Sequence, residues 1–178
     1  MTTKELEQII YWTLYKQGTY LCFEVAMPNP KGRCMVTTER VDLLSYETTG
    51  IWRFYELKIS KSDFHSKNKA TFYGNYNYYV MPKELYDKVK DEIPPEIGCY
   101  VASVSKWGMP NCYCIKKPKK QELQISSDKL MFQLMQSLSR ENQKQQKTKY
   151  KKVLEKFRKS ACSSPPSLVD SIFGGEDF

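Results

Sequence analysis

The spacing of apolar residues predicts both helices and strands along this chain. A helical period places Leu6, Ile10 and Leu14 on one face of a helix over residues 4–16, which we expect to end at Gly18. Runs rich in β-branched and aromatic residues predict strands at 20–27, 41–46, 51–59, 76–81, 98–105 and 111–115. Further helices are expected over 61–72, over 82–90 and from Ser127 onward.

Residues 40–58 hold two of these strands, joined by a turn. The four residues between them, ETTG, have turn chemistry, and Gly50 can adopt a positive φ. If Thr49 is the centre of the turn, Asp42 lies directly opposite Glu56. Opposed residues have Cβ atoms roughly 5 Å apart, and like charges there repel. The hairpin therefore predicts a cation between the two carboxylates.

A divalent metal ion is the natural candidate for that cation. Mg²⁺, or Mn²⁺ in its place, favours carboxylate oxygens and water. Because side chains alternate along a strand, Lys58 points the same way as Glu56, close enough to stabilise charge on a phosphate. The alternative is that this acid-x-Lys strand is an ordinary solvated face. The opposed Asp42 and the apolar flanks favour the metal site.

These residues also carry a family resemblance. Asp42 followed by Glu56-Leu57-Lys58 resembles the metal-binding core of the PD-(D/E)XK nuclease superfamily, with Val41 in place of the proline. Over residues 4–115 the chain is similar to the MmcB-like DNA repair proteins and their phage-borne relatives, through RVDLL, YELKISKSDFHSKNK, YNYYVMPKELYDKV and IPPEIGCYVAS. The resemblance implies an α/β fold with a mixed central sheet flanked by helices, restriction-endonuclease-like, followed here by a C-terminal helix and a basic tail.

The resemblance further implies a metal-dependent DNA endonuclease that acts in repair, recombination or phage DNA processing. Asp42, Glu56 and the Leu57 carbonyl would hold Mg²⁺ or Mn²⁺, and Lys58 would position the attacking water. The alternative is a nuclease-like fold that binds DNA or a partner protein without cutting. Opposed carboxylates favour the enzyme, because a pure binder does not need them.

A third acid often assists such sites. Glu24 lies on the strand before the core, and the MmcB-like relatives also tend to carry a Glu there. Other branches of the superfamily place theirs at the start of the first helix, where Glu7 and Glu5 stand. We favour Glu24, then Glu7, because acids on a helix surface are common.

The positive charge is concentrated near the C-terminus. The chain has a net charge of +8, and residues 140–159 hold nine Lys or Arg against Glu141 and Glu155. This segment suits a polyanion such as DNA, with a solvated tail as the alternative. The N-terminus of the helix expected from residue 61 also favours a phosphate. The lysines expected to contact nucleic acid are Lys61, Lys67, Lys69, Lys147, Lys149, Lys151 and Lys152.

Length and composition predict one nuclease-like domain over residues 1–120, a C-terminal helix and basic extension over 121–159, and a disordered acidic tail over 160–178. No run is long and apolar enough for a membrane span or a signal core. Six cysteines in 178 residues do not form a small disulfide scaffold. We expect a protein of the cytoplasm of a bacterial or phage-infected cell. Two partners are suggested. One is a second copy of the chain, packed through the apolar stripe at 130–138, and the other is a replication or repair protein.

Overall fold

The structure is a computed structural model, and it describes residues 1–27, 39–66 and 72–160. Its elements, in chain order, are α1 (Thr3–Leu14), β1 (Thr19–Ala26), β2 (Arg40–Glu47), β3 (Ile51–Leu57), α2 (Lys61–Phe64), β4 (Tyr76–Pro82), α3 (Lys83–Val89), the 3₁₀ turn η1 (Lys90–Glu92), β5 (Gly98–Val104), β6 (Pro110–Lys116) and α4 (Ser127–Ser160). Each predicted strand is present to within a few residues. One compact unit, Met1–Leu138, includes the beginning of α4.

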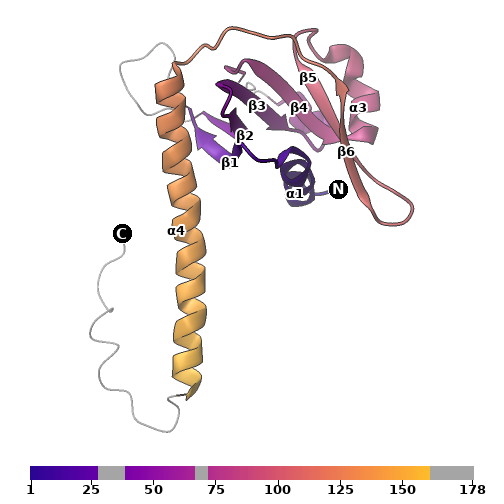
Figure 1. The fold of residues 1–178 in the computed structure, drawn as a ribbon. Helices are drawn as coiled ribbons and strands as arrows, with labels where there is room; N and C mark the ends of the chain where they lie inside the picture. The colour runs from indigo at the N-terminus through magenta and orange to yellow at the C-terminus, as the bar shows by residue number, and fades with distance from the viewer. Residues whose placement is uncertain (28–38, 67–71, 161–178) are drawn as a thin grey trace. The chain divides into compact units, whose positions relative to one another are not determined.

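The six strands form one mixed sheet in the order β1-β2-β3-β4-β5-β6 (Figure 1). Neighbours pair antiparallel from β1 to β3 and again between β5 and β6, whereas β3, β4 and β5 run parallel. Parallel neighbours need a crossover connection, which α3 supplies between β4 and β5. The predicted α/β fold, a mixed sheet with flanking helices and a C-terminal helix, is confirmed.

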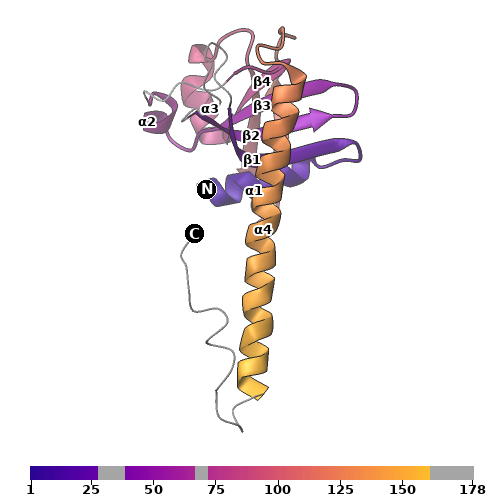
Figure 2. The same cartoon turned by 90° about the vertical axis from the view of Figure 1, so that its left-hand side faces the viewer.

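Helices cover both faces of the sheet. On one face, Leu6 and Ile10 of α1 pack against a cluster that includes Tyr55 and Leu57. On the other face, α3 and the first turns of α4 bury the core clusters, α3 through Leu85 and Val89 and α4 through Leu130 and Leu134. Figure 2 shows α1 and α3 on opposite sides of the strands. The central strands β2 to β5 are therefore largely buried on both faces, and polar side chains can lie at their ends.

The β2–β3 hairpin has the predicted register. Pairing runs from Glu47 opposite Ile51 to Leu43 opposite Tyr55, which centres the turn on Thr49. Gly50 adopts φ +84°, the left-handed region that glycine tolerates best. The pairing ends one residue before Asp42 and Glu56. Past that point β3 keeps its pairing with β4, and the Lys58 N–H donates to the Val80 carbonyl. The two strands separate where the two acids lie.

The first helix ends earlier than predicted. It stops at Leu14 with Tyr15 extended, and Gly18, at φ +76°, lies in the turn that enters β1. The Gly18 carbonyl accepts the N–H of Thr48 from the β2–β3 turn. Gly18 is therefore fixed by the sheet and not by the helix.

The helix after the core is much shorter than the predicted range 61–72. It ends at Phe64, and Phe72 is not helical. Phe64 and Phe72 both pack on Tyr79, with ring centroids 5.1 Å away in each case. In a continuous helix these two residues would stand about 12 Å apart along the axis. Residues 67–71 of the predicted helix lie outside the described residues.

The C-terminal helix continues through the basic extension to Ser160. Its Lys, Gln, Glu and Arg residues are good helix formers, and Lys144 pairs with Glu141 one turn earlier at 2.8 Å. No helix in the described ranges is both long and apolar enough to cross a membrane. The predicted acidic tail at 161–178 lies outside the described residues.

Candidate active site

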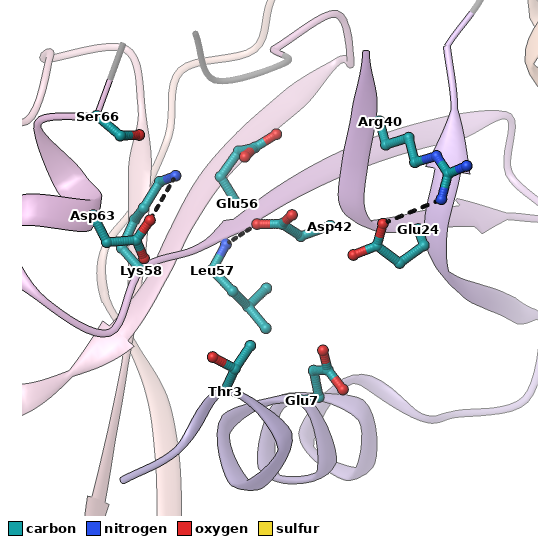
Figure 3. Close-up of a pocket in the computed structure, with 10 residues that line it drawn as sticks. All are labelled: Thr3, Glu7, Glu24, Arg40, Asp42, Glu56, Leu57, Lys58, Asp63 and Ser66. Atoms are coloured by element: carbon teal, nitrogen blue, oxygen red, sulfur yellow. Dashed lines mark hydrogen bonds and ion pairs between the residues drawn. The ribbon is translucent and has the colours of Figure 1, made fainter. Parts of the chain in front are cut away.

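A pocket of about 310 Å³ lies where β3 ends, beside the start of α1 (Figure 3). Its lining is rich in charge and has more acids than bases. The five acids are Glu7, Glu24, Asp42, Glu56 and Asp63, and the two bases are Arg40 and Lys58. The hairpin thus brings the predicted Asp42, Glu56, Leu57 and Lys58 to one pocket, with the two favoured third acids beside them.

Asp42 is held by the main chain of β3. Its Oδ2 accepts the Leu57 N–H at 2.7 Å, just past the end of the β2–β3 pairing. Burial raises the pKa of Asp42 above its usual value, and the charges of Glu24 and Asp63 add to the rise, while the Leu57 N–H and Lys58 oppose it. Asp42 is therefore an oriented carboxylate for which ionisation is costly unless a cation is near.

Glu56 and Lys58 are also nearly buried, at 5% and 8% exposure. They alternate with Tyr55 and Leu57, which belong to the core cluster beneath α1, so the predicted two-face pattern of β3 is confirmed. In Figure 3 the Asp42 carboxylate lies between Glu56 on one side and Glu7 on the other. Two polar side chains this deeply placed at a strand end are unusual for an ordinary solvated face.

Sequence reasoning missed Asp63 as a member of the site. Its Oδ1 lies 3.7 Å from the Lys58 Nζ, and its Oδ2 accepts the Ile59 N–H at 3.2 Å. The Asp63 N–H in turn donates to the hydroxyl of Ser60, the N-cap of α2. The Ser-x-x-Asp capping pattern contained this information, because it brings the acid back toward the residues that precede the cap.

Glu24 lines the pocket from an irregular point in β1. Its φ is +53°, which is rare for a residue other than glycine. On either side of it, Phe23 packs toward the α1 face while Val25 packs in the opposite cluster, although a regular strand would place both on one face. This irregularity changes the direction of the Glu24 side chain, whose Oε2 lies 3.8 Å from the Arg40 Nη1. Strain of this kind tends to occur at functional sites.

The two acids of α1 occupy different positions. Glu7 is half-buried and lines the pocket, and its pKa is raised by burial and then by the charges of Glu24 and Asp42. Glu5 is exposed and does not line the pocket, because it closes a capping box in which the Thr2 N–H donates to its Oε2 at 2.7 Å. Of the three candidates for a further acid, Glu7 and Glu24 therefore line the pocket and Glu5 does not.

The predicted phosphate site at the start of α2 is not supported. The helix has a single turn, and its capping interactions already use the amides of Ile59 and Asp63. Lys61 is exposed, and Lys67 and Lys69 lie outside the described residues. The four lysines predicted on the basic extension, Lys147, Lys149, Lys151 and Lys152, are all exposed on α4.

The residues of the pocket fit a hard divalent cation. Asp42, Glu56 and the Leu57 carbonyl offer oxygen donors, and Mg²⁺ typically takes one or two carboxylates and keeps several waters. The excess of acids over bases, and the raised pKa values of Asp42 and Glu7, are the electrostatic state that a cation would relieve. Over residues 1–27, 39–66 and 72–160, no three His, Cys, Asp or Glu side chains are grouped to hold a metal between them. Waters would have to complete the shell.

Comparison with known proteins shows the fold alone. No protein-family model and no curated protein matches the chain. Among solved structures, it is similar to the SPO1766 protein of unknown function from Silicibacter pomeroyi, at 15% identity and a TM-score of 0.56. The match covers 81% of this chain and 88% of that one.

Proposed function

We propose that this protein is a metal-dependent nuclease that hydrolyses phosphodiester bonds of DNA, in repair, recombination or phage DNA processing. The observation that carries the proposal is the convergence of Asp42, Glu56 and Lys58 on one acidic pocket where β2 and β3 separate. The resemblance of this core to PD-(D/E)XK enzymes of the MmcB-like kind supports the same function.

Each residue has a task in this proposal. Asp42 and Glu56, with the Leu57 carbonyl, would hold Mg²⁺ or Mn²⁺, and Glu24 or Glu7 would supply a further acid. Bound there, the metal would stabilise charge on the phosphate and make a coordinated water more acidic. Lys58 would donate hydrogen bonds to the attacking water or to a phosphate oxygen, and Asp63 would aim its ammonium.

A basic stripe on α4 supports DNA as the substrate. At about 100° per residue, the positions of five basic residues fall within roughly 60° of the helix circumference. They are Arg140, Lys144, Lys147, Lys151 and Arg158. Lys149 and Lys152 lie outside this stripe. A row of cations along a helix face can follow a phosphate backbone without reading sequence. We propose that the stripe binds DNA, with Lys147 and Lys151 as its central contacts.

A protein that binds DNA or a repair partner without cutting is the second candidate. Two observations favour it. No group of three ligand side chains occurs in the described part of the chain, and Lys58 is engaged by Asp63. Both functions use the same pocket and fold, so only a cleavage assay separates them.

The deciding experiment incubates the protein with linear, nicked, branched and single-stranded DNA, and with RNA, in Mg²⁺, Mn²⁺ or EDTA. We expect metal-dependent cutting that Asp42→Ala and Lys58→Ala each reduce by roughly 100-fold or more. Glu84→Ala and Lys88→Ala, which remove the same charges from the exposed surface of α3, are the matched controls. Circular dichroism confirms that all four variants are folded.

Two outcomes would reject the enzyme. If the Asp42 and Lys58 variants cut as well as the parent, the activity belongs elsewhere or to a contaminant. If the parent binds DNA but cuts nothing with any metal, the binding function is the correct one.

A further inference from the structure

The turn between β5 and β6 presents large apolar side chains to solvent. Trp107 is 81% exposed and Met109 67% exposed, and Val104 at the foot of the turn is also exposed. Single exposed apolar residues are common, but three within six positions of one hairpin form a patch. In Figure 1 this hairpin extends beyond the ends of the neighbouring strands.

The turn is held in one conformation. The Ser105 hydroxyl accepts the N–H groups of Trp107 and Met109 at 3.3 and 3.1 Å. The Ser105 main chain pairs with Met109 and Gly108, each at 2.9 Å, and Gly108 takes φ +77°. The backbone that carries Trp107 is therefore ordered before any ligand arrives, which lowers the entropic cost of binding.

The charge around the patch suits a polyanion. Residues 97–121 contain five lysines and no Asp or Glu, but four of the five lie at 116–120, at the opposite end of the hairpin. The turn itself carries one charged residue, Lys106, whose ammonium lies 5.2 Å from the centroid of the Trp107 ring. An apolar tip with a lysine beside it complements a ligand that combines apolar faces with phosphates. Nucleic acid, with its stacked bases, is such a ligand.

The topology places this tip at the same edge of the sheet as the acidic pocket. Because β3, β4 and β5 are parallel, Leu57, Val80 and Tyr100 stand level across them. Val104 lies four residues further, about 13 Å along the strand, and β5 is two strand spacings, about 10 Å, from β3. The tip is thus on the order of 20 Å from the pocket, about six base-pair steps of a duplex at 3.4 Å each.

We propose that the β5–β6 tip is a second DNA contact, in which Trp107 and Met109 pack against or between bases of a duplex whose backbone lies at the acidic pocket. The proposal rests on the proposed function in taking DNA as the ligand and in placing its backbone at the acidic pocket. Apolar side chains that enter a duplex act as wedges that unstack a base step. Lys106 contacts a neighbouring phosphate.

The test measures DNA affinity in EDTA, so that cutting does not interfere. Trp107→Ala should weaken duplex binding roughly tenfold, as expected for one lost base stack, and leave the salt slope unchanged. Lys106→Ala should flatten the slope by about 0.9. Trp12→Ala is the matched control, because Trp12 is 66% exposed on α1.

Fluorescence identifies the ligand. DNA should change the tryptophan emission of the parent and of Trp12→Phe but not of Trp107→Phe. Unchanged affinity of Trp107→Ala, or an emission response to phosphatidylserine vesicles but not to DNA, would overturn the proposal. The outcome of this test does not depend on whether the protein is a nuclease. A parent that cuts nothing but loses affinity on Trp107→Ala supports the tip contact alone, and a parent that cuts while Trp107→Ala binds normally supports the nuclease alone.

Discussion

Replacing Asp42 by Asn should make the metal-free protein more stable. Asn keeps an oxygen that can accept the Leu57 N–H, but it removes a negative charge from a pocket where acids outnumber bases. Burial and the charges of Glu24 and Asp63 raise the pKa of Asp42, so its ionised form is disfavoured in the fold. An ionised carboxylate that destabilises the fold in the absence of metal is expected at a metal site.

The size of the effect follows from the neighbours of Asp42. Two unit charges about 8 Å apart interact by about 2 kcal/mol at an effective dielectric constant of about 20. Among the charges that shift the pKa of Asp42, Glu24 and Asp63 repel it and Lys58 attracts it, so neutralising Asp42 relieves a net repulsion of about 2 kcal/mol. Weakening the Leu57 hydrogen bond from a charged to a neutral one costs about 1 kcal/mol. The net gain of about 1 kcal/mol corresponds to a Tm rise of about 2–4 °C.

The gain should also depend on pH. Because the folded-state pKa of Asp42 lies above its usual 3.8, the parent loses stability as pH rises from 3.8 through the folded-state value. Asn does not titrate. Thermal melts in EDTA from pH 3 to pH 8 should therefore show equal stabilities in acid and a gap in favour of Asp42→Asn that grows and then levels off. Glu84→Gln, an exposed control, should show no such gap.

Saturating Mn²⁺ should reverse the order, because it stabilises the parent and not Asp42→Asn. At about 100 times its dissociation constant the ion adds about 2.7 kcal/mol. A variant that melts below the parent in EDTA at neutral pH, or a gap that ignores pH, would refute the electrostatic argument.

Three further predictions test the fold and the tail. Glu24→Gly should raise stability by about 1 kcal/mol in urea melts, because glycine tolerates the φ of +53° that strains Glu24; a loss of stability would contradict the strain. Gly74→Ala should lower the urea midpoint, because an added Cβ would stand 2.5 Å from the Phe54 ring and 3.0 Å from the Trp52 carbonyl oxygen; an unchanged midpoint would show that the ring gives way. Truncation after Ser139 should weaken DNA binding and flatten its salt slope while the Mn²⁺-induced rise in Tm persists, and an unchanged slope would assign the basic stripe to another partner.

The hairpin at the centre of the candidate site could be predicted because its causes are local. A turn sequence fixes a register, and strand alternation then places Glu56 and Lys58 together and opposite Asp42. These rules act over a few residues and need no knowledge of the rest of the chain. The same holds for the mixed α/β character, which follows from two short periodicities.

Long-range packing decided the rest. Whether Glu5 or Glu7 reaches the pocket depends on how α1 rotates to bury Leu6 and Ile10, and sequence spacing alone does not give that angle. The packing of Phe64 and Phe72 on Tyr79, a residue of the next strand, is likewise a contact that sequence spacing does not give. The left-handed Glu24 is held by the pairing of β1 with β2 just before and just after it, against an intrinsic preference of about 1–2 kcal/mol. Local preferences of that size are smaller than the burial energies of the core, so wherever the two conflict, tertiary contacts prevail.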